Sequence, residues 1–239
     1  MKSYLQILPL ILASMPLSTA TIPPVTFCPS CPKPIHCDNT GWDWAYYSNP
    51  LFNSGENYPG FSADVYKTRQ PEYTSVTPSI GGHLGYTAAN PDVTTFYGSS
   101  KELNATYFAI NHHAYLYACE AGTYQFDISY VDDVVFAWVG ETAYSGWTDE
   151  NRDAKAVWTF QGDTHYGSAS FRKDLDIGSF NPLRFVFGNG QNGGLFNLTI
   201  TSPSGVLVHQ SGRDSDYIVR YSCDFQISAP KFPAFGAET

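Results

Sequence analysis

The sequence predicts an all-β protein, an antiparallel β-sandwich, from three observations. Aromatic residues make up 16% of the 239-residue chain and charged residues only 15%. Tyr, Phe, Thr and Val, which are enriched in strands, are abundant, whereas strong helix formers are few. The apolar runs are short and recur between turn signals in a chain that contains 20 Gly and 16 Pro, which is typical of a sandwich.

The first twenty residues have the features of an export signal. Lys2 gives a basic start, residues 4–12 are largely apolar, and Ser18 and Ala20 are small residues at the spacing that a signal peptidase requires. We therefore expect residues 1–20 to be a signal peptide, 21–236 to form one domain, and 237–239 to be a tail or the start of a linker. No later apolar run reaches the roughly 18 residues that cross a bilayer, so we expect a secreted protein without a membrane span.

Cysteine usage agrees with export. The five cysteines are Cys28, Cys31, Cys37, Cys119 and Cys223. In an oxidising compartment they are expected to form disulfides, which leaves one free or paired outside the chain. The spacing of Cys28 and Cys31 also occurs in zinc and redox sites, but only His36 is close enough to add a ligand. We expect the Pro-rich N-terminal segment, residues 21–40, to be tied to the C-terminal end. Such a long closure stabilises by about 4–5 kcal/mol.

From residue 41 onward, short apolar or alternating runs predict the strands. They lie at 42–47, 94–98, 105–110, 114–140 (several strands), 156–160, 183–189, 195–205 and 216–225. Ser-Pro-Ser-Gly and Gly-Asn-Gly-Gln-Asn-Gly-Gly supply turn chemistry, and residues 148–154 have the pattern of one helical turn. Asn104-Ala-Thr and Asn197-Leu-Thr are N-glycosylation acceptors, consistent with secretion.

The charge of the chain limits its ligands. The formal charge is −9, and removal of Lys2 with the signal leaves 12 basic against 22 acidic residues, or −10. A field of this sign repels nucleic acid, and no cluster of Lys or Arg overrides it. Neutral ligands such as sugars, and cations, remain open.

The paired acids Asp132 and Asp133 are the most unusual feature, because apolar strand-like runs flank them on both sides. A solvated hairpin turn is one interpretation. The other is a cation site, since two carboxylates at the edge of a core repel each other and lose hydration. Calcium offsets both costs, but it takes about 6–8 oxygens, so a second segment must contribute. The loop at 187–194 (FGNGQNGG) offers the Asn189 amide oxygen and backbone carbonyls, although an ordinary hairpin loop has the same composition.

Eight segments together resemble the fungal GLEYA adhesin domains, in family order over residues 37–236. They are 41–45 (GWDWA), 131–133 (VDD), 138–140 (WVG), 143–148 (AYSGWT), 185–194 (FVFGNGQNGG), 197–205 (NLTITSPSG), 221–224 (YSCD) and 229–236 (APKFPAFG). The resemblance implies a β-sandwich of PA14/GLEYA type with irregular, disulfide-stapled terminal segments. It also implies a non-enzymatic, calcium-dependent lectin of the fungal cell surface or wall, related to the yeast flocculins and epithelial adhesins.

Carried over residue by residue, the resemblance implies a calcium site. The acids, joined by a cis peptide, would bind Ca²⁺ with Asn189 and the main-chain carbonyls of Gln191 and Gly193, and two hydroxyls of a terminal sugar would complete the shell. The carbohydrate-binding set would be Asp132, Asp133, Trp147, Asn189, Gly190, Gln191 and Asn192. Specificity would lie at Gly190 and Asn192, and a core position is an equal interpretation for Trp147.

The expected partners are glycans that end in a hexose or an N-acetylhexosamine, on cell surfaces or in chitin and other wall polysaccharides. Binding at one such site is weak, so we expect a monomeric domain that acts through many copies. His83, His112 and His113 are not assigned a role.

Two alternatives stay open at this point. A secreted glycoside hydrolase needs two carboxylates about 5–10 Å apart, and Glu120, Glu141, Glu150 and Asp153 are present without a recognisable motif. A structural wall protein would use calcium only to stiffen loops. Sugar release distinguishes the hydrolase from the other two, and a glycan array distinguishes a lectin from a wall protein.

Overall fold

The computed structural model describes residues 31–51, 57–89, 92–160 and 164–238. The predicted signal peptide and Cys28 lie outside the described residues. Among the residues that are described, no helix has the length and apolar character needed to cross a membrane.

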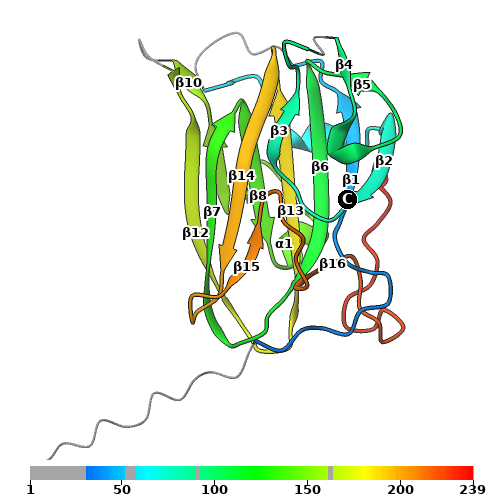
Figure 1. The fold of residues 1–239 in the computed structure, drawn as a ribbon, viewed down its shortest axis with the longest axis vertical. Coiled ribbons are helices and arrows are strands. Elements are labelled where there is room, and N and C mark those ends of the chain that lie inside the picture. Colours follow the sequence, from blue (N-terminus) through cyan, green and yellow to red (C-terminus); the bar gives the residue numbers. More distant parts are fainter. Residues whose placement is uncertain (1–30, 52–56, 90–91, 161–163, 239) are drawn as a thin grey trace, which may run out of the picture. The chain divides into compact units, whose positions relative to one another are not determined.

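Two antiparallel sheets make up the sandwich (Figure 1). In sheet A the order is β2 (Tyr73–Thr77), β1 (Trp42–Ser48), β6 (Phe108–Tyr117), β13 (Phe180–Asn189), β8 (Val134–Val139) and β9 (Ala154–Val157), with β16 (Ile218–Val219) also paired to β6. In sheet B it is β12 (Gly167–Leu175), β7 (Gly122–Asp132), β14 (Gly193–Thr201) and β15 (Leu207–Gln210), with β3 (Gly82–Gly85) also paired to β14. The predicted fold class is confirmed.

Short elements complete the described structure. Two small ribbons pair β4 (Val93–Thr94) with β5 (Leu103–Asn104) and β10 (Thr159–Phe160) with β11 (Thr164–His165). The helical pieces are η1 (Ala63–Tyr66), η2 (Phe96–Gly98) and α1 (Glu141–Tyr144).

The strand patterns follow from which faces are covered. In β14 the side chains of Phe196, Leu198 and Ile200 are buried and alternate with half-buried neighbours, as expected when one face of a sheet packs on the core. Strand β8 (VVFAWV) is buried throughout, because one face contributes to the inter-sheet core and the other to a second apolar cluster. Its unbroken apolar sequence is therefore a sign of coverage on both faces.

The closing segment, residues 229–238, lies over sheet A on the face away from sheet B. Phe232 and Phe235 stack on the two sides of the His113 ring, each with ring centroids 4.2 Å away. Glu238 is 4% exposed and its Oε1 lies 3.0 Å from Nη1 of Arg184, which is fully buried. The segment thus covers apolar surface and supplies the counter-charge for a buried arginine.

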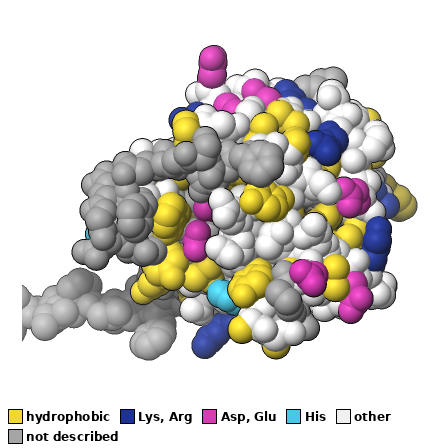
Figure 2. All heavy atoms as spheres, turned by 90° about the horizontal axis from the view of Figure 1, so that it is seen from above, with side chains coloured by type: hydrophobic (Ala, Val, Ile, Leu, Met, Phe, Trp, Pro, Cys, Tyr) yellow, Lys and Arg dark blue, Asp and Glu magenta, His cyan; other side chains and the backbone are white. Residues whose placement is uncertain are grey.

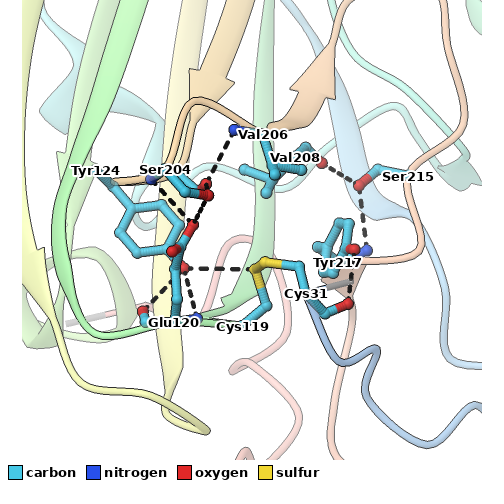
Figure 3. The surroundings of a disulfide bond; sticks show 10 residues. Cys31, Cys119, Glu120, Tyr124, Ser204, Val206, Val208, Ser215 and Tyr217 are labelled. Atoms are coloured by element: carbon cyan, nitrogen blue, oxygen red, sulfur yellow. Dashed lines mark hydrogen bonds between the residues drawn. A yellow bond between two sulfur atoms is a disulfide. The ribbon is translucent and has the colours of Figure 1, made fainter. Parts of the chain in front are cut away.

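Two disulfides fasten the terminal segments, as predicted. Cys37 is bonded to Cys223, 186 positions later, and so ties the N-terminal segment to the C-terminal end. Cys31 is bonded to Cys119 beside Glu120, whose carboxylate accepts a hydrogen bond from the Ser204 hydroxyl at 2.6 Å (Figure 3). Because Cys31 is in a disulfide, the zinc or redox interpretation of its spacing to Cys28 is not supported.

Three local predictions are wrong. Of the run at 216–225, only Ile218–Val219 forms a strand, β16. Residues 148–154 form no helix, because Asn151 and Thr148 bond each other's backbone N–H groups through their side chains instead; the short helix is α1. The run at 94–98 is mostly the η2 turn, in which Tyr97 has a left-handed backbone and its hydroxyl bonds Nε2 of His112 at 2.9 Å. Competing side-chain hydrogen bonds of this kind are invisible to a hydrophobic pattern.

Because three histidines are buried, we expect the folded chain to lose stability in acid. Burial lowers the pKa of His112 and His209 to about 3 and that of His113 to about 4, whereas an unfolded histidine titrates near 6.5. Below pH 6.5 the unfolded chain therefore binds protons that the folded chain rejects, so stability is complete above that pH and falls as pH decreases. Each histidine contributes about 1.4 kcal/mol per pH unit. Asp132, whose pKa is raised to about 6, offsets part of this loss of stability.

Urea titrations at pH 7.5, 6 and 5 check this prediction. We expect a loss of roughly 4 kcal/mol in unfolding free energy between pH 6.5 and pH 5. The variant His209→Phe should have a shallower slope by about one third. Equal stability at pH 7.5 and pH 5 would contradict the prediction.

Candidate functional site

The paired acids lie at one end of the sandwich, where β7 and β13 end and β8 begins. Asp132 ends β7 and pairs with Leu195 of β14, and Asp133 connects β7 to β8. Asn189 ends β13, whose preceding residue Gly188 pairs with Val134. The two segments singled out in the sequence therefore meet, as proposed, and Figure 2 looks onto this end of the molecule.

A direct hydrogen bond joins the two segments. The backbone N–H of Gly190 donates to Oδ2 of Asp133 at 2.6 Å, and the peptide between Asp132 and Asp133 is cis. Asp133 is only 6% exposed. The pKa of Asp132 is raised to about 6 by burial and by the neighbouring charge of Asp133. Two carboxylates are thus held together where solvent screens them poorly, which is unfavourable unless a cation or a proton is bound.

Asn189 places an amide oxygen at the same end. Its side chain is fully buried and its Nδ2 donates to the Asn192 carbonyl at 2.9 Å, which fixes the orientation of the amide. Its Oδ1 is buried and accepts no hydrogen bond from any described residue. A Cβ at Gly194 would lie 3.0 Å from this oxygen and 2.4 Å from the Phe187 ring. Glycine at 194 therefore keeps the space beside an unpartnered oxygen open.

Buried polar side chains that the sequence analysis missed hold the loop. Asn49 Nδ2 donates to the Asn189 carbonyl at 3.0 Å, and Asn49 Oδ1 accepts from the Tyr66 hydroxyl at 2.9 Å. The N–H of Tyr107 donates to the Gly190 carbonyl at 3.0 Å. These groups come from distant parts of the chain, and each is an ordinary Asn or Tyr in the sequence. Only the fold identifies them as supports of the loop.

The remaining loop positions differ in exposure. Gln191 and Asn192 are exposed, and Asn192 has a left-handed backbone with φ of 59°. Gly193 faces Gly85 of β3, and a Cβ there would lie 2.4 Å from the Tyr86 carbonyl oxygen. Gly190 and Gln191 belong to the same turn, and the turn meets the acids through the hydrogen bond from Gly190 to Asp133.

Trp147 does not lie at this end, and its predicted role as a pocket-lining residue is corrected. Its side chain is fully buried. Its Nε1 donates to Oε2 of Glu238 at 3.0 Å, and the Arg184 guanidinium lies 4.8 Å from its ring centroid. Of the two interpretations that the sequence left open, the core position is the one observed, because Trp147 contacts the closing segment and the buried ion pair.

Two exposed tyrosines lie close to Asp132 in the strand register. Gly167 pairs with Val131, so the preceding residue, Tyr166, is level with Asp132 on the neighbouring strand. Tyr166 is 50% exposed and Tyr130 is 58% exposed, with ring centroids 6.2 Å apart. Nothing in the sequence distinguishes them from the other tyrosines, of which the chain has 17 in all.

The other predicted positions are spread over the molecule. Among the histidines, His112 and His113 are buried in β6 and His83 is exposed on β3. Asn104 is exposed and Asn197 is half-buried on β14, and their glycosylation stays a prediction.

The comparisons with known proteins agree with this arrangement. Residues 108–202 match the family model of the GLEYA domain, and this stretch includes both acids and the glycine-rich loop. Residues 108–202 of this chain are therefore similar to the GLEYA domain. Two proteins of Schizosaccharomyces pombe named as cell agglutination proteins are similar to it, one 29% identical over 203 residues (77% of this chain) and one 38% identical over 95 residues (39% of this chain). The chain spans only 16% and 23% of their respective lengths.

Solved structures have a fold similar to that of this chain. The A domain of epithelial adhesin 6 from Candida glabrata, in complex with Galβ1-3GlcNAc, superimposes with a TM-score of 0.58 at 22% identity, covering 79% of this chain and 90% of that one. The A domain of epithelial adhesin 9, in complex with Galβ1-4GlcNAc, gives 0.54 at 17% identity, covering 74% and 90%. At sequence identities this low, the likeness shows a shared fold and nothing more.

Proposed function

We propose that this chain is a calcium-dependent lectin that binds the terminal hexose of a glycan. The observation that carries the proposal is the meeting of the Asp132–Asp133 pair with the buried, unpartnered Oδ1 of Asn189. Carboxylate and amide oxygens are the ligands that calcium prefers. A bound cation would remove the repulsion between the acids and give the orphaned oxygen a partner.

The remaining coordination would come from the exposed turn. Main-chain carbonyls of Gln191 and Gly193 are the proposed additional ligands, and two vicinal hydroxyls of a sugar would complete the 6–8 oxygens that calcium requires. The structures of epithelial adhesins in complex with galactose-containing disaccharides support a glycan as the ligand. A non-enzymatic role fits the family and the agglutination proteins among its relatives.

The location proposed for the whole protein is the fungal cell surface or wall. The support is the naming of longer relatives as cell agglutination proteins. Sites that bind one sugar weakly gain avidity when many copies are displayed on one surface. Chitin ends and wall polysaccharides stay possible ligands beside cell-surface glycans.

Tyr166 replaces Trp147 as the proposed aromatic contact to the sugar. It is level with Asp132 and half-exposed, and an aromatic ring can cover the apolar face of a pyranose. We expect Tyr166→Ala to weaken glycan binding about tenfold, while calcium binding changes less than twofold, because a contact of this kind is worth about 1–1.5 kcal/mol. Calorimetric titration with calcium and then with glycan separates the two effects, and Tyr217→Ala, at a half-buried position away from the site, is the control. Unchanged glycan affinity in Tyr166→Ala would remove this residue from the site.

A glycan array on the purified protein tests the function itself. With calcium present, we expect binding to one class of terminal hexose or N-acetylhexosamine, and we expect chelator to abolish it. A folded protein that binds no glycan in calcium would contradict the lectin and favour a structural wall protein. Release of reducing sugar from a bound oligosaccharide would instead support a glycoside hydrolase.

A further inference from the structure

The end of the sandwich away from the proposed calcium site presents an apolar patch. Strand β13 begins at Phe180 beside this patch and ends at Asn189 in the site, ten residues and roughly 30 Å later. The patch consists of four large apolar side chains that are mostly exposed: Phe225 at 96%, Ile35 at 80%, Ile227 at 79% and Ile177 at 62%. Ile35 lines one cavity, and the other three lie one to three positions along the chain from Gly178 or Asp224, which also line it.

That cavity has a volume of about 380 Å³ and adjoins the patch. Its lining includes Ile35, Gly178 and Asp224, with the half-buried rings of Tyr117 and Phe180, whose centroids are 5.2 Å apart. A cavity of about 150 Å³ already accepts a benzene molecule, so a phenyl ring fits here. Since the Phe225 ring is 96% exposed, it does not fill the cavity of its own chain.

The loop that carries Phe225 is held in place by the side chain of Asp224. Oδ1 of Asp224 accepts the Ile227 N–H at 3.0 Å, and its carboxylate also accepts the hydroxyls of Ser222 and Ser228. The preceding residue, Cys223, is in a disulfide.

The backbone of the same loop adopts a rare conformation. Phe225 and Gln226 have φ values of 60° and 64°, which non-glycine residues seldom adopt. A non-glycine residue keeps a φ value of this kind only where the surrounding structure stabilises it. Because the loop is already ordered, little entropy remains to be lost when Phe225 binds a partner.

We infer that this patch pairs two copies of the chain, with Phe225 of each copy inserted into the cavity of the other. A protruding ring beside an apolar cavity is self-complementary under a two-fold axis, as an isologous contact requires. The four side chains expose on the order of 600 Å². Two copies would therefore bury about 1,200 Å² in all, the lower end for a specific interface. The pairing is accordingly weak, and it replaces the expectation of a strictly monomeric domain.

The position of the patch decides how the two glycan sites of a pair are oriented. Because the patch and the proposed calcium site lie at opposite ends of β13, the two glycan sites of a pair face away from each other. This part of the inference rests on the proposed function, and it makes the pair a bivalent cross-linker of glycan-bearing surfaces. The net charge of −9 opposes pairing, so salt should strengthen it.

Sedimentation equilibrium of the secreted chain tests the pairing without any glycan. We expect a concentration-dependent dimer with a dissociation constant between about 10 μM and 1 mM, tighter at higher salt. Phe225→Asp and Ile35→Asp, which change the ring and the cavity wall in turn, should each weaken the dimer at least about tenfold. The control is Val93→Asp, an exposed valine of β4, which should leave it unchanged.

A chain that stays monomeric up to about 1 mM, or a Phe225→Asp variant that dimerises like the unchanged chain, would overturn the inference. Agglutination of glycan-coated beads then distinguishes the pairing of two copies from the lectin proposal. Phe225→Asp should lose agglutination while it keeps its single-site glycan affinity and its calcium dependence. If no glycan binds, the lectin proposal fails and the sedimentation result still decides the pairing.

Discussion

Replacing Glu238 with alanine is expected to lower the unfolding free energy by about 3–5 kcal/mol, although the residue stands next to the end of the chain. Its carboxylate is the counter-charge of Arg184, which is fully buried in β13, and it accepts the indole N–H of Trp147 at 3.0 Å. Without it, the guanidinium stays in the interior with the Asn111 amide oxygen and the Ala143 carbonyl as its acceptors among the described residues. A buried charge that has lost its partner is among the costliest single changes known.

Chemical denaturation of Glu238→Ala measures this cost. The matched control is Asp216→Asn, which breaks an exposed ion pair with Lys33 at 2.6 Å and should cost less than about 1 kcal/mol. Arg184→Leu combined with Glu238→Leu should recover part of the loss, because the unpaired charge is then gone. A cost below about 1 kcal/mol for Glu238→Ala would mean that the closing segment does not neutralise Arg184 in solution.

Replacing Asp133 with asparagine is expected to abolish calcium binding and, with it, glycan binding, a loss of at least about a hundredfold. The change keeps the size of the side chain and an oxygen that can accept the Gly190 N–H, so the fold should persist. It removes a negative charge from a site whose affinity for a dication depends on charge. Asp132→Asn should act in the same way, since the two carboxylates are adjacent and Asp132 is partly buried.

Calcium titration by calorimetry and thermal unfolding with and without calcium measure these effects. For the unchanged chain, calcium at a hundred times its dissociation constant should stabilise the fold by about 2.7 kcal/mol, and the variants should show no such gain. Asp127→Asn, an acid on the same strand whose Oδ1 accepts the Ser170 hydroxyl at 2.6 Å, is the control. Glycan binding that survives in Asp133→Asn, or in chelator, would contradict calcium-mediated recognition.

Local chemistry made part of the site predictable. Asp132 and Asp133 stand out because adjacent acids rarely interrupt a strand-like run, and the loop at 187–194 stands out because its glycines and asparagines suit a tight turn. The resemblance to a family linked the two segments, and the fold places them together. Trp147 shows the limit of this reasoning, since its distance along the chain from Asp133 carries no information on which layer of the fold it occupies.

The sequence by itself determined the class of fold and the two segments that meet at the proposed calcium site. These features depend on short-range patterns, which residue type and spacing encode directly. Only the tertiary structure decided that Trp147 is a core residue, that Asn49 supports the loop, and that Tyr166 stands level with Asp132. It also decided that Glu238 neutralises Arg184. Each of these relations joins residues through strand register or through a segment laid over a sheet, and register and packing are set by the whole chain at once.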